Sequence, residues 1–317
     1  MRYVVTGSAG FVGSHVCEAL LARGDEVDGV DAFTDYYDPA IKRANTASLA
    51  RHERFRAVEL DLARVDLDHV LDGVLAGADA VIHLAAQPGV RLSWSDGFGL
   101  YIERNISASQ RLLEAARRTR VPRLVLASSS SVYGNAAARP ITEDAPTRPF
   151  SPYGVTKLAV EHLAAAYGAN WGVSTVVLRY FTLYGPGQRP DMALHRFIDA
   201  VAGGLPVTVY GDGEQVRDFT YVSDAAAATL AALEADVAPA SVFNVAGGSP
   251  ATVNDLLRLV SEHVGRPLVV RHLAAQAGDV RATHGSIARA RRELGWWPEV
   301  SLDDGVKRQV VHQLGGR

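Results

Sequence analysis

Two residues four positions apart, Tyr153 and Lys157, could act as an acid–base pair in this 317-residue chain. Ser151 and Pro152 precede them, and these residue types favour the cap and the first position of a helix. Residues four apart share a helical face, so the Lys157 ammonium would lie near the phenol. A nearby positive charge lowers the pKa of a phenol, so that more of it is present as phenolate, the form that can accept a proton. The alternative is an unrelated pair of polar residues on a surface helix.

The N-terminus carries a second chemical pattern, three glycines spaced three apart after a short apolar run. Gly7 would permit a tight turn, and Gly10 would let the backbone approach a pyrophosphate. Gly13 would let the following helix pack closely on the strand, while the helix N-terminus supplies free N–H donors. The pattern therefore predicts a nucleotide-phosphate site with these members: Gly7, Gly10, Phe11, Val12 and Gly13.

An acidic residue, Asp31, ends the next strand candidate, residues 26–31. A carboxylate there accepts hydrogen bonds from ribose hydroxyls and repels a 2′-phosphate, which predicts NAD and not NADP as the cofactor. Lys42 and Arg43 follow, and we expect them to lie too far along the chain to reverse this preference. Asp31 could alternatively be a polar residue at a strand end.

Composition excludes several classes of protein. The formal net charge is −3 and the basic residues are scattered, which argues against a nucleic-acid-binding surface. A single cysteine, Cys17, excludes an internal disulfide and a cysteine metal cluster, and its apolar neighbours predict core packing. No metal site is expected. No apolar run approaches the roughly 18 residues of a spanning helix, and no signal-peptide core precedes the first strand, which predicts a cytoplasmic protein without a membrane partner.

The alternation of strand and helix patterns predicts an α/β fold. Strand candidates in the first part of the chain are residues 3–6, 26–31, 55–60, 80–84, 123–128 and 174–179. They predict a doubly wound parallel sheet, a Rossmann domain that binds NAD, over residues 1–180. Glycine and proline interrupt the later pattern, which predicts a smaller C-terminal α/β substrate domain over residues 181–317. Segments near residues 217–245, with a strand at 242–245, are expected to return to the large sheet.

Several motifs in a fixed order carry a family resemblance. Residues 6–13 read Thr-Gly-x-x-Gly-x-x-Gly, and Asp61-Leu62, Leu84-Ala85-Ala86 and Asn105 follow. Together with Tyr153 and Lys157 they resemble the extended short-chain dehydrogenase/reductase family, specifically its NAD-dependent nucleotide-sugar epimerases and dehydratases. The resemblance covers nearly the whole chain. It implies that these motif residues contact NAD, with Asp61 and Leu62 beside the adenine.

The segment before Tyr133 separates the reactions known in this family. Ser129 aligns with the epimerase hydroxyl that hydrogen-bonds the sugar 4-oxygen, so the resemblance implies a catalytic set of Ser129, Tyr153 and Lys157. Family dehydratases carry acids where this chain has Ser130 and Ser131, and sugar-acid decarboxylases carry Glu at the position of Ser131. Both reactions are therefore disfavoured. Oxidation and re-reduction at C4 remain, unless Ser129 is only a polar strand terminus.

The substrate is indicated by later segments, which look most like UDP-glucuronate 4-epimerases. Thr182 replaces the usual Asn of an Arg-Tyr-Phe-Asn stretch, and residues 35–38 and 189–193 also match. The resemblance implies that Ser129, Ser130 and Thr182 bind the C5 carboxylate of the sugar, with Arg189 nearby. Arg189 could alternatively belong to an ordinary surface loop.

Two further segments resemble the part of the family that binds the nucleotide diphosphate. They make Arg217 a bidentate phosphate ligand and place Asp279 beside the sugar nucleotide. Gln276 replaces an arginine common in UDP-glucose epimerases. His83 lies near a buried strand end and is expected to be structural.

The implied reaction leaves alternatives open. A UDP-glucose or UDP-N-acetylglucosamine 4-epimerase would share the same residues, and a non-catalytic NAD-sensing module could use the same fold. A UDP-glucuronate decarboxylase is less consistent with Ser131. The helical stretches around residues 102–116 and 153–167 carry apolar residues on more than one face, and family members commonly pair through these helices. A homodimer is therefore expected.

Overall fold

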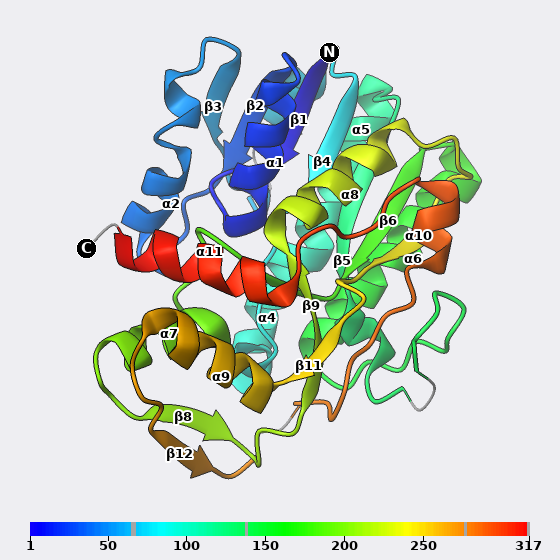
Figure 1. Cartoon of the computed structure of the whole chain (residues 1–317). Coiled ribbons are helices and arrows are strands. Elements are labelled where there is room, and N and C mark those ends of the chain that lie inside the picture. Colours follow the sequence, from blue (N-terminus) through cyan, green and yellow to red (C-terminus); the bar gives the residue numbers. More distant parts are fainter. Residues whose placement is uncertain (65–67, 137–138, 276–277, 316–317) are drawn as a thin grey trace.

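A seven-stranded sheet, parallel throughout, forms the centre of the computed structural model (Figure 1). The structure describes residues 1–64, 68–136, 139–275 and 278–315, so Gln276 lies outside the described residues. In spatial order the strands are β10 (Ser241–Val245), β6 (Thr175–Tyr180), β5 (Leu124–Ser129), β4 (Ala80–His83), β1 (Arg2–Thr6), β2 (Glu26–Asp31) and β3 (Phe55–Glu59). The predicted strands are found with ends within one residue, and the predicted doubly wound sheet is confirmed.

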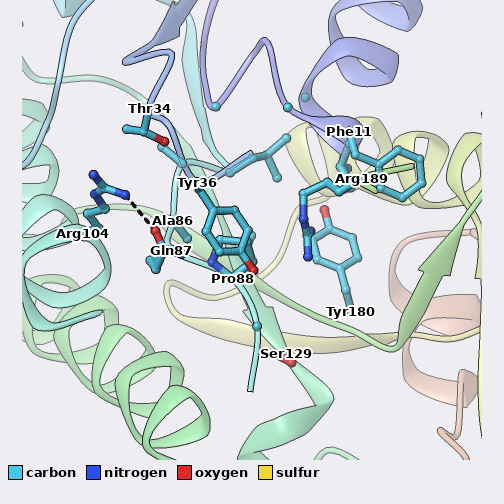
Figure 2. A pocket seen from close by; sticks show the side chains of 18 of the residues that line it. Phe11, Thr34, Tyr36, Ala86, Gln87, Pro88, Arg104, Ser129, Tyr180 and Arg189 are labelled. Carbon is cyan, nitrogen blue, oxygen red and sulfur yellow. Dashed lines mark hydrogen bonds between the residues drawn. The ribbon is translucent and has the colours of Figure 1, made fainter. Parts of the chain in front are cut away.

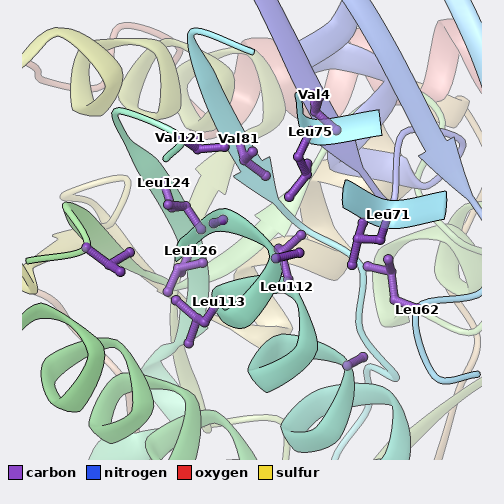
Figure 3. Packing of buried hydrophobic residues seen from close by; sticks show 14 of the residues in the cluster. Val4, Leu62, Leu71, Leu75, Val81, Leu112, Leu113, Val121, Leu124 and Leu126 are labelled. Carbon is purple, nitrogen blue, oxygen red and sulfur yellow. The ribbon is translucent and has the colours of Figure 1, made fainter. Parts of the chain in front are cut away.

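Helices cover both faces of this sheet, as an all-parallel sheet requires. One apolar cluster joins the strands to α3 (Asp68–Leu75), α5 (Ala108–Thr119) and α6 (Pro152–Trp171). Figure 3 shows its leucines from α3 and α5 packed on β4 and β5. On the other face, α1 (Phe11–Ala22) packs against α8 (Val222–Glu234). Val4 faces the first cluster while Tyr3 and Val5 face the second, following the two-residue period of a strand. Cys17 is buried in the second cluster, as predicted.

A smaller group of elements follows in the C-terminal half. It has a three-stranded sheet of β11 (Pro250–Thr252), β9 (Val216–Tyr221) and β7 (Thr182–Tyr184), and a pair of β8 (Val207–Tyr210) with β12 (Val270–Leu273). Its apolar core includes residues of α7 (Ala193–Ala202), α9 (Val253–Val264) and α11 (Leu302–Gly315). The chain returns to the large sheet through α8 and β10. The expected return from residue 217 is wrong for residues 217–221, because β9 pairs with β7 and β11 instead.

Short helices complete the structure. They are α2 (Pro39–Thr46), α4 (Phe98–Tyr101), α10 (Ala288–Glu293), a π-helical turn η5 (Ile102–Ser107), and the 3₁₀ turns η1 (Leu49–Arg51), η3 (Arg91–Ser93), η4 (Ser95–Gly97) and η6 (Ser130–Tyr133). None of the helices in the described ranges combines the length and apolar character needed to span a membrane.

The strand order reverses beside β1. From β1 the chain proceeds to β2 on one side, and the later strand β4 pairs on its other side. Connections that run to opposite sides leave a crevice at the carboxyl ends of the two strands. This crevice is where a ligand of such a sheet is expected to bind.

Candidate functional site

A cavity of about 420 Å³ lies at the carboxyl ends of the central strands (Figure 2). It brings together most of the predicted site residues, which come from the carboxyl ends of β1 to β5, from the start of α1, from α6, and from β7 and the loop after it. Those that line it are Gly7, Gly10, Phe11, Val12, Gly13, Asp31, Asp61, Leu62, Leu84, Ala85, Ala86, Ser129, Ser130, Tyr153, Lys157, Thr182 and Arg189. Three predicted residues, all in described parts of the chain, do not line it: Asn105, Arg217 and Asp279.

The glycine turn between β1 and α1 is closely packed. A Cβ on Gly13 would lie 2.0 Å from the Gly7 carbonyl oxygen, and one on Gly7 would lie 2.7 Å from the Ala85 backbone nitrogen. Gly7 also has a φ of +74°, which larger residues rarely adopt. Because α1 begins at Phe11, its unpaired first-turn N–H groups belong to the cavity wall. The turn is therefore shaped to bind an anion such as a pyrophosphate.

Asp31 is held from three directions. Its carboxylate accepts hydrogen bonds from Phe33 N at 2.8 Å and Ala9 N at 3.2 Å, and the Lys42 ammonium lies 3.3 Å from Oδ1. The part of the expectation that placed Lys42 far from Asp31 is therefore wrong, although this contact does not reverse the NAD preference. Helix α2 folds back over the strand end, so that a residue distant in sequence becomes a buried ion-pair partner.

Tyr153 and Lys157 lie in the first two turns of α6, where the sequence predicted them. Ser151 caps this helix by accepting a hydrogen bond from Gly154 N at 3.2 Å, and Pro152 follows it. The Lys157 ammonium is almost fully buried and donates to the Ala127 carbonyl at 2.9 Å. Burial lowers the pKa of Lys157 to about 8, although the negative charge of Glu161 raises it. Lys157 is therefore charged below about pH 8 and neutral above.

The environment of Tyr153 contains opposing effects. Burial raises the pKa of the phenol, while a hydrogen bond with Ser129 and the positive charge of Arg189 lower it. The Tyr101 ring stands edge-on to Tyr153, with ring centroids 6.2 Å apart. Ser129 ends β5, and the chain turns there because the Ser131 N–H bonds the Ser129 hydroxyl at 3.1 Å. The predicted catalytic hydroxyl therefore lies close enough to the predicted catalytic phenol to affect its pKa.

Arg189 enters the cavity from the loop after β7. Its guanidinium donates to both carboxylate oxygens of Asp191, at 2.9 and 3.1 Å. The Tyr36 hydroxyl donates to the same carboxylate at 3.2 Å, and the Arg189 guanidinium lies over the Tyr36 ring. Arg189 lines the same cavity as Thr182 and Tyr153, and its contact with a substrate carboxylate stays a prediction.

Arg217 and Asp279 lie in a neighbouring cavity of about 220 Å³. They form an ion pair with each other through Arg217 Nη2 and Asp279 Oδ1. Ser130 and Thr182 line both cavities, so the two spaces meet at the predicted carboxylate site. A ligand long enough to reach Arg217 could therefore place its other end beside Tyr153.

Asn105 lies behind the cavity wall and is 1% exposed. Its side-chain oxygen accepts from Gln87 N at 2.7 Å, and its amide donates to Gln87 O at 3.1 Å and Thr156 Oγ1 at 3.0 Å. Asn105 therefore positions Gln87, and its predicted contact with a cofactor stays a prediction.

The sequence reasoning missed Gln87 and Arg104, which line the cavity and are hydrogen-bonded to each other at 2.8 Å (Figure 2). No motif marked either residue.

His83 is buried under the site and supports its structure. Its ring nitrogens lie 2.7 Å from Thr6 Oγ1 and 2.9 Å from Ser109 Oγ. Burial and the charge of Lys157 lower the pKa of His83 to about 3, so the ring stays neutral. This agrees with the predicted structural role. The described His, Cys, Asp and Glu residues form no group that could hold a metal ion.

Comparison with known proteins establishes the family. Residues 3–246 match the model of the NAD dependent epimerase/dehydratase family. The chain belongs to this family. The parallel sheet, the glycine turn after β1 and the Tyr153–Lys157 pair in one cavity agree with this assignment.

The relatives define the subgroup that the chain resembles. It is 40% identical to an uncharacterised UDP-glucose epimerase of Bacillus subtilis, with 98% of each chain covered. It is 37% identical to a UDP-glucuronate 4-epimerase of Thermodesulfobacterium geofontis, covering 97% of this chain and 94% of the relative. A solved structure of the Bacillus cereus UDP-glucuronic acid 4-epimerase with UDP-glucuronic acid and NAD is 39% identical, covers both chains fully and superimposes with a TM-score of 0.95.

The packing of the glycine turn yields a direct test. Gly13→Ala would force the Gly7 carbonyl to move, so we expect NAD binding, measured by calorimetry, to weaken at least about tenfold. Gly73→Ala is the matched control, because a Cβ on Gly73 meets nothing within 4 Å. The control should bind NAD like the wild type. Unchanged binding by a folded Gly13→Ala variant would contradict the cradle.

Proposed function

We propose that this protein is an NAD-dependent UDP-sugar 4-epimerase that converts UDP-glucuronate to UDP-galacturonate through a transient 4-keto sugar. The observation that carries the proposal is the meeting of Ser129, Tyr153 and Lys157 with the glycine cradle in one cavity. The relatives named UDP-glucuronate 4-epimerase, similar over nearly their whole length, support it. The protein is therefore assigned to the isomerases.

The cradle fits NAD because only glycine can occupy the positions of Gly7 and Gly13 without displacing backbone. Gly10, Phe11 and Val12 would complete the pyrophosphate site. Asp31 would bind the adenosine ribose. The contacts further along the cofactor are assigned to Asp61, Leu62, Leu84, Ala85 and Ala86. When bound, NAD would accept a hydride from C4 and return it to the opposite face of the sugar.

The proton is handled by the chain's own residues. Tyr153 would take the proton from the sugar 4-hydroxyl and later give it back. Ser129, which lies near the phenol, would bond the sugar 4-oxygen. The Lys157 ammonium would stabilise the phenolate, and this requires Lys157 to be protonated. Activity should therefore fall as the pH rises above the pKa of Lys157.

Arg217 would hold the diphosphate of the substrate, releasing Asp279 from the ion pair. With the nucleotide fixed there, the pyranose can turn about its phosphate linkage and present its other face. Arg217 is well suited to exchange partners, because its guanidinium is charged at neutral pH and little exposed, so that a phosphate could replace Asp279 as its anionic partner. The junction of the two cavities at Ser130 and Thr182 supports a sugar at this place.

If the substrate is a glucuronate, the site must fix the orientation of its carboxylate. Its 4-keto form is a β-keto acid, which loses carbon dioxide when the carboxylate stands perpendicular to the carbonyl plane. Ser129, Ser130 and Thr182 would hold the carboxylate out of that orientation, with Arg189 supplying positive charge. The absence of a glutamate at Ser131 is consistent with epimerisation and not decarboxylation.

A UDP-glucose 4-epimerase is the second candidate. Arg189 is already neutralised by Asp191, and a relative at 40% identity bears the name UDP-glucose epimerase. UDP-N-acetylglucosamine remains a further alternative. An NAD-sensing module is disfavoured because Ser129, Tyr153 and Lys157 are all present and assembled.

We also propose which part of the chain binds each ligand. Residues 1–180, with the returning α8 and β10, would bind NAD, and residues 181–317 would mainly bind the nucleotide sugar. A cytoplasmic location stays a prediction from the sequence.

We further propose a homodimer formed through the surface of α4, η5 and α6. Leu100, Ile102 and Val155 are exposed there, and Val155 borders an apolar groove with Trp94 and Phe150.

The proposed chemistry is tested with Tyr153→Phe and a panel of UDP-glucuronate, UDP-glucose and UDP-N-acetylglucosamine, with products resolved by NMR. We expect the variant to fold and bind NAD but to lose at least about a hundredfold in turnover. Tyr167→Phe is the matched control on the same helix, because Tyr167 bonds Glu114 away from the cavity. A Tyr153→Phe variant with wild-type turnover would remove Tyr153 from the mechanism.

The carboxylate assignment is tested with Thr182→Val. Loss of a charge-assisted hydrogen bond costs about 1.5 to 3 kcal/mol, so kcat/KM for UDP-glucuronate should fall roughly ten- to a hundredfold. UDP-glucose, with a neutral hydroxymethyl group, should be less affected. Thr182→Ser keeps the hydroxyl and should retain the preference. Equal losses on both substrates would show that Thr182 supports the fold or the nucleotide.

The dimer is tested by light scattering at micromolar concentration. We expect the wild type to be dimeric and Val155→Glu to be monomeric, because a buried unpaired charge is strongly unfavourable. Val70→Glu is the matched control, since both valines are 49% exposed and Val70 lies on α3. A monomeric wild type would refute the dimer.

A further inference from the structure

A buried ion pair lies directly behind the Tyr153–Lys157 pair. Arg179, on β6, donates to Glu161, on α6, through Nε at 2.9 Å and Nη2 at 2.6 Å. The two side chains are only 6% and 7% exposed. Removing two charges from water is costly, and apolar residues of similar volume often serve stability equally well. The pair therefore calls for a role other than stability.

Contacts of Glu161 lead to the site. Glu161 follows Lys157 by one helical turn, and its carboxylate also accepts the Ser128 hydroxyl. Ser128 lies between Ala127, whose carbonyl binds the Lys157 ammonium, and Ser129, whose hydroxyl lies near the Tyr153 phenol. One carboxylate thus ties the end of β5 to α6 at the point where all three predicted catalytic residues meet.

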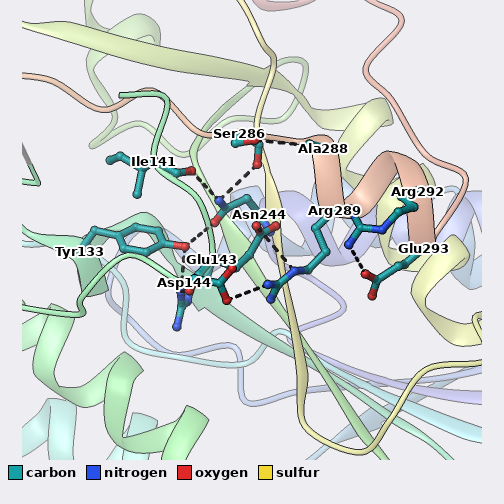
Figure 4. A network of polar contacts seen from close by, with 11 residues as sticks. Tyr133, Ile141, Glu143, Asp144, Asn244, Ser286, Ala288, Arg289, Arg292 and Glu293 are labelled. Atoms are coloured by element: carbon teal, nitrogen blue, oxygen red, sulfur yellow. Dashed lines mark hydrogen bonds and ion pairs between the residues drawn. The ribbon is translucent and has the colours of Figure 1, made fainter. Parts of the chain in front are cut away.

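The far side of Arg179 is fixed as well. Its Nη1 donates to the Tyr133 hydroxyl at 2.7 Å and to the Glu143 carbonyl at 3.1 Å. The Tyr133 hydroxyl donates to Asn244 on β10, whose backbone N–H is bonded by the Glu143 carboxylate (Figure 4). Arg179 is thereby held in place from behind, and it holds the Glu161 carboxylate toward Lys157.

We propose that Glu161 is a positioning residue of the active site: held by Arg179, it fixes residues 127–129 against α6 and places a negative charge one helical turn from Lys157. The catalytic part of this inference rests on the proposed epimerase function. The electrostatic part concerns the folded protein alone and can be measured without turnover.

The charged groups around Lys157 support this assignment. On α6 these are Glu161 and Tyr153, and the phenol is neutral at neutral pH because burial raises its pKa. His83 on β4 is also neutral. Arg179 on β6 stands behind Glu161, and Arg189 acts on Tyr153 from the opposite side. Glu161 is therefore the anion that opposes the loss of charge that burial imposes on Lys157.

The chain contains only three lysines, Lys42, Lys157 and Lys307, which makes a direct titration practicable. NMR of lysine-labelled protein would follow each ammonium with pH, and Lys157→Arg would identify the Lys157 signal. In Glu161→Gln we expect the proton dissociation constant of Lys157 to rise at least about tenfold, because the anion one helical turn away is lost and the Arg179 cation is left unpaired. An unchanged Lys157 titration in the folded variant would overturn the proposal.

Three further variants separate charge from structure. Glu161→Asp keeps the carboxylate and should restore the dissociation constant to within about threefold of wild type. E161M/R179M should fold, and its Lys157 titration should shift less than that of Glu161→Gln, because the anion and its cationic partner are removed together. Asp28→Asn breaks another ion-pair cluster, with Arg2 of β1 and Arg56 of β3, and should leave Lys157 unaffected. If Glu161→Gln does not fold, a Glu161→Asp variant whose Lys157 dissociation constant rises about tenfold or more would equally refute the role of charge.

Kinetics give the second readout. With UDP-glucuronate, the alkaline limb of the kcat profile of Glu161→Gln should move to lower pH by the same factor as the Lys157 titration, with KM changed less than about twofold. A kcat profile that keeps the wild-type limb while the titration moves would refute the positioning role. Failure of the wild type to convert any UDP-sugar would instead refute the proposed function, and the titration would still decide the electrostatic part.

Discussion

Parallel pairing of β1 with both β2 and β4 is the constraint on which the site depends. It makes the carboxyl ends of the central strands diverge at one edge, and the glycine turn after β1 occupies that edge. The turn can lie there only because Gly13 allows α1 to approach the Gly7 carbonyl so closely. Residues separated by more than 150 positions in sequence, such as Gly7 and Thr182, then line one cavity.

Buried cations are the second theme of the site, and each has an anionic or carbonyl partner. Lys42 is paired with Asp31, Arg189 with Asp191, and Arg217 with Asp279, while Lys157 binds the Ala127 carbonyl. Such pairing keeps positive charge tolerable in a poorly solvated cavity. It also affects the affinity for a ligand, because an entering phosphate or carboxylate must displace the aspartate that is already paired with the cation. The proposed preference for an acidic sugar depends on this competition.

Two layers of polar contacts support the chemistry. The inner layer is formed by groups that face the cavity, such as the Ser129 hydroxyl and the Tyr153 phenol. Behind it, Asn105 holds Gln87, and Glu161 with Arg179 holds the end of β5. The outer contacts cross between α6, β5, β6 and the returning strand β10. The late segment of the chain therefore contributes to the geometry of residues that lie a hundred positions earlier.

Local patterns in the sequence determined the strands, the glycine turn, the cap of α6 and the Tyr153–Lys157 pair, because each depends on residues a few positions apart. Ordered motifs added the family. Only the tertiary structure decided the rest: α2 folds back to bring Lys42 to Asp31, β9 joins a separate sheet, and Asn105 retreats behind Gln87. It also revealed Glu161 beside Arg179. These contacts join residues that no local spacing relates, and their energies depend on burial, which arises only when distant elements pack together.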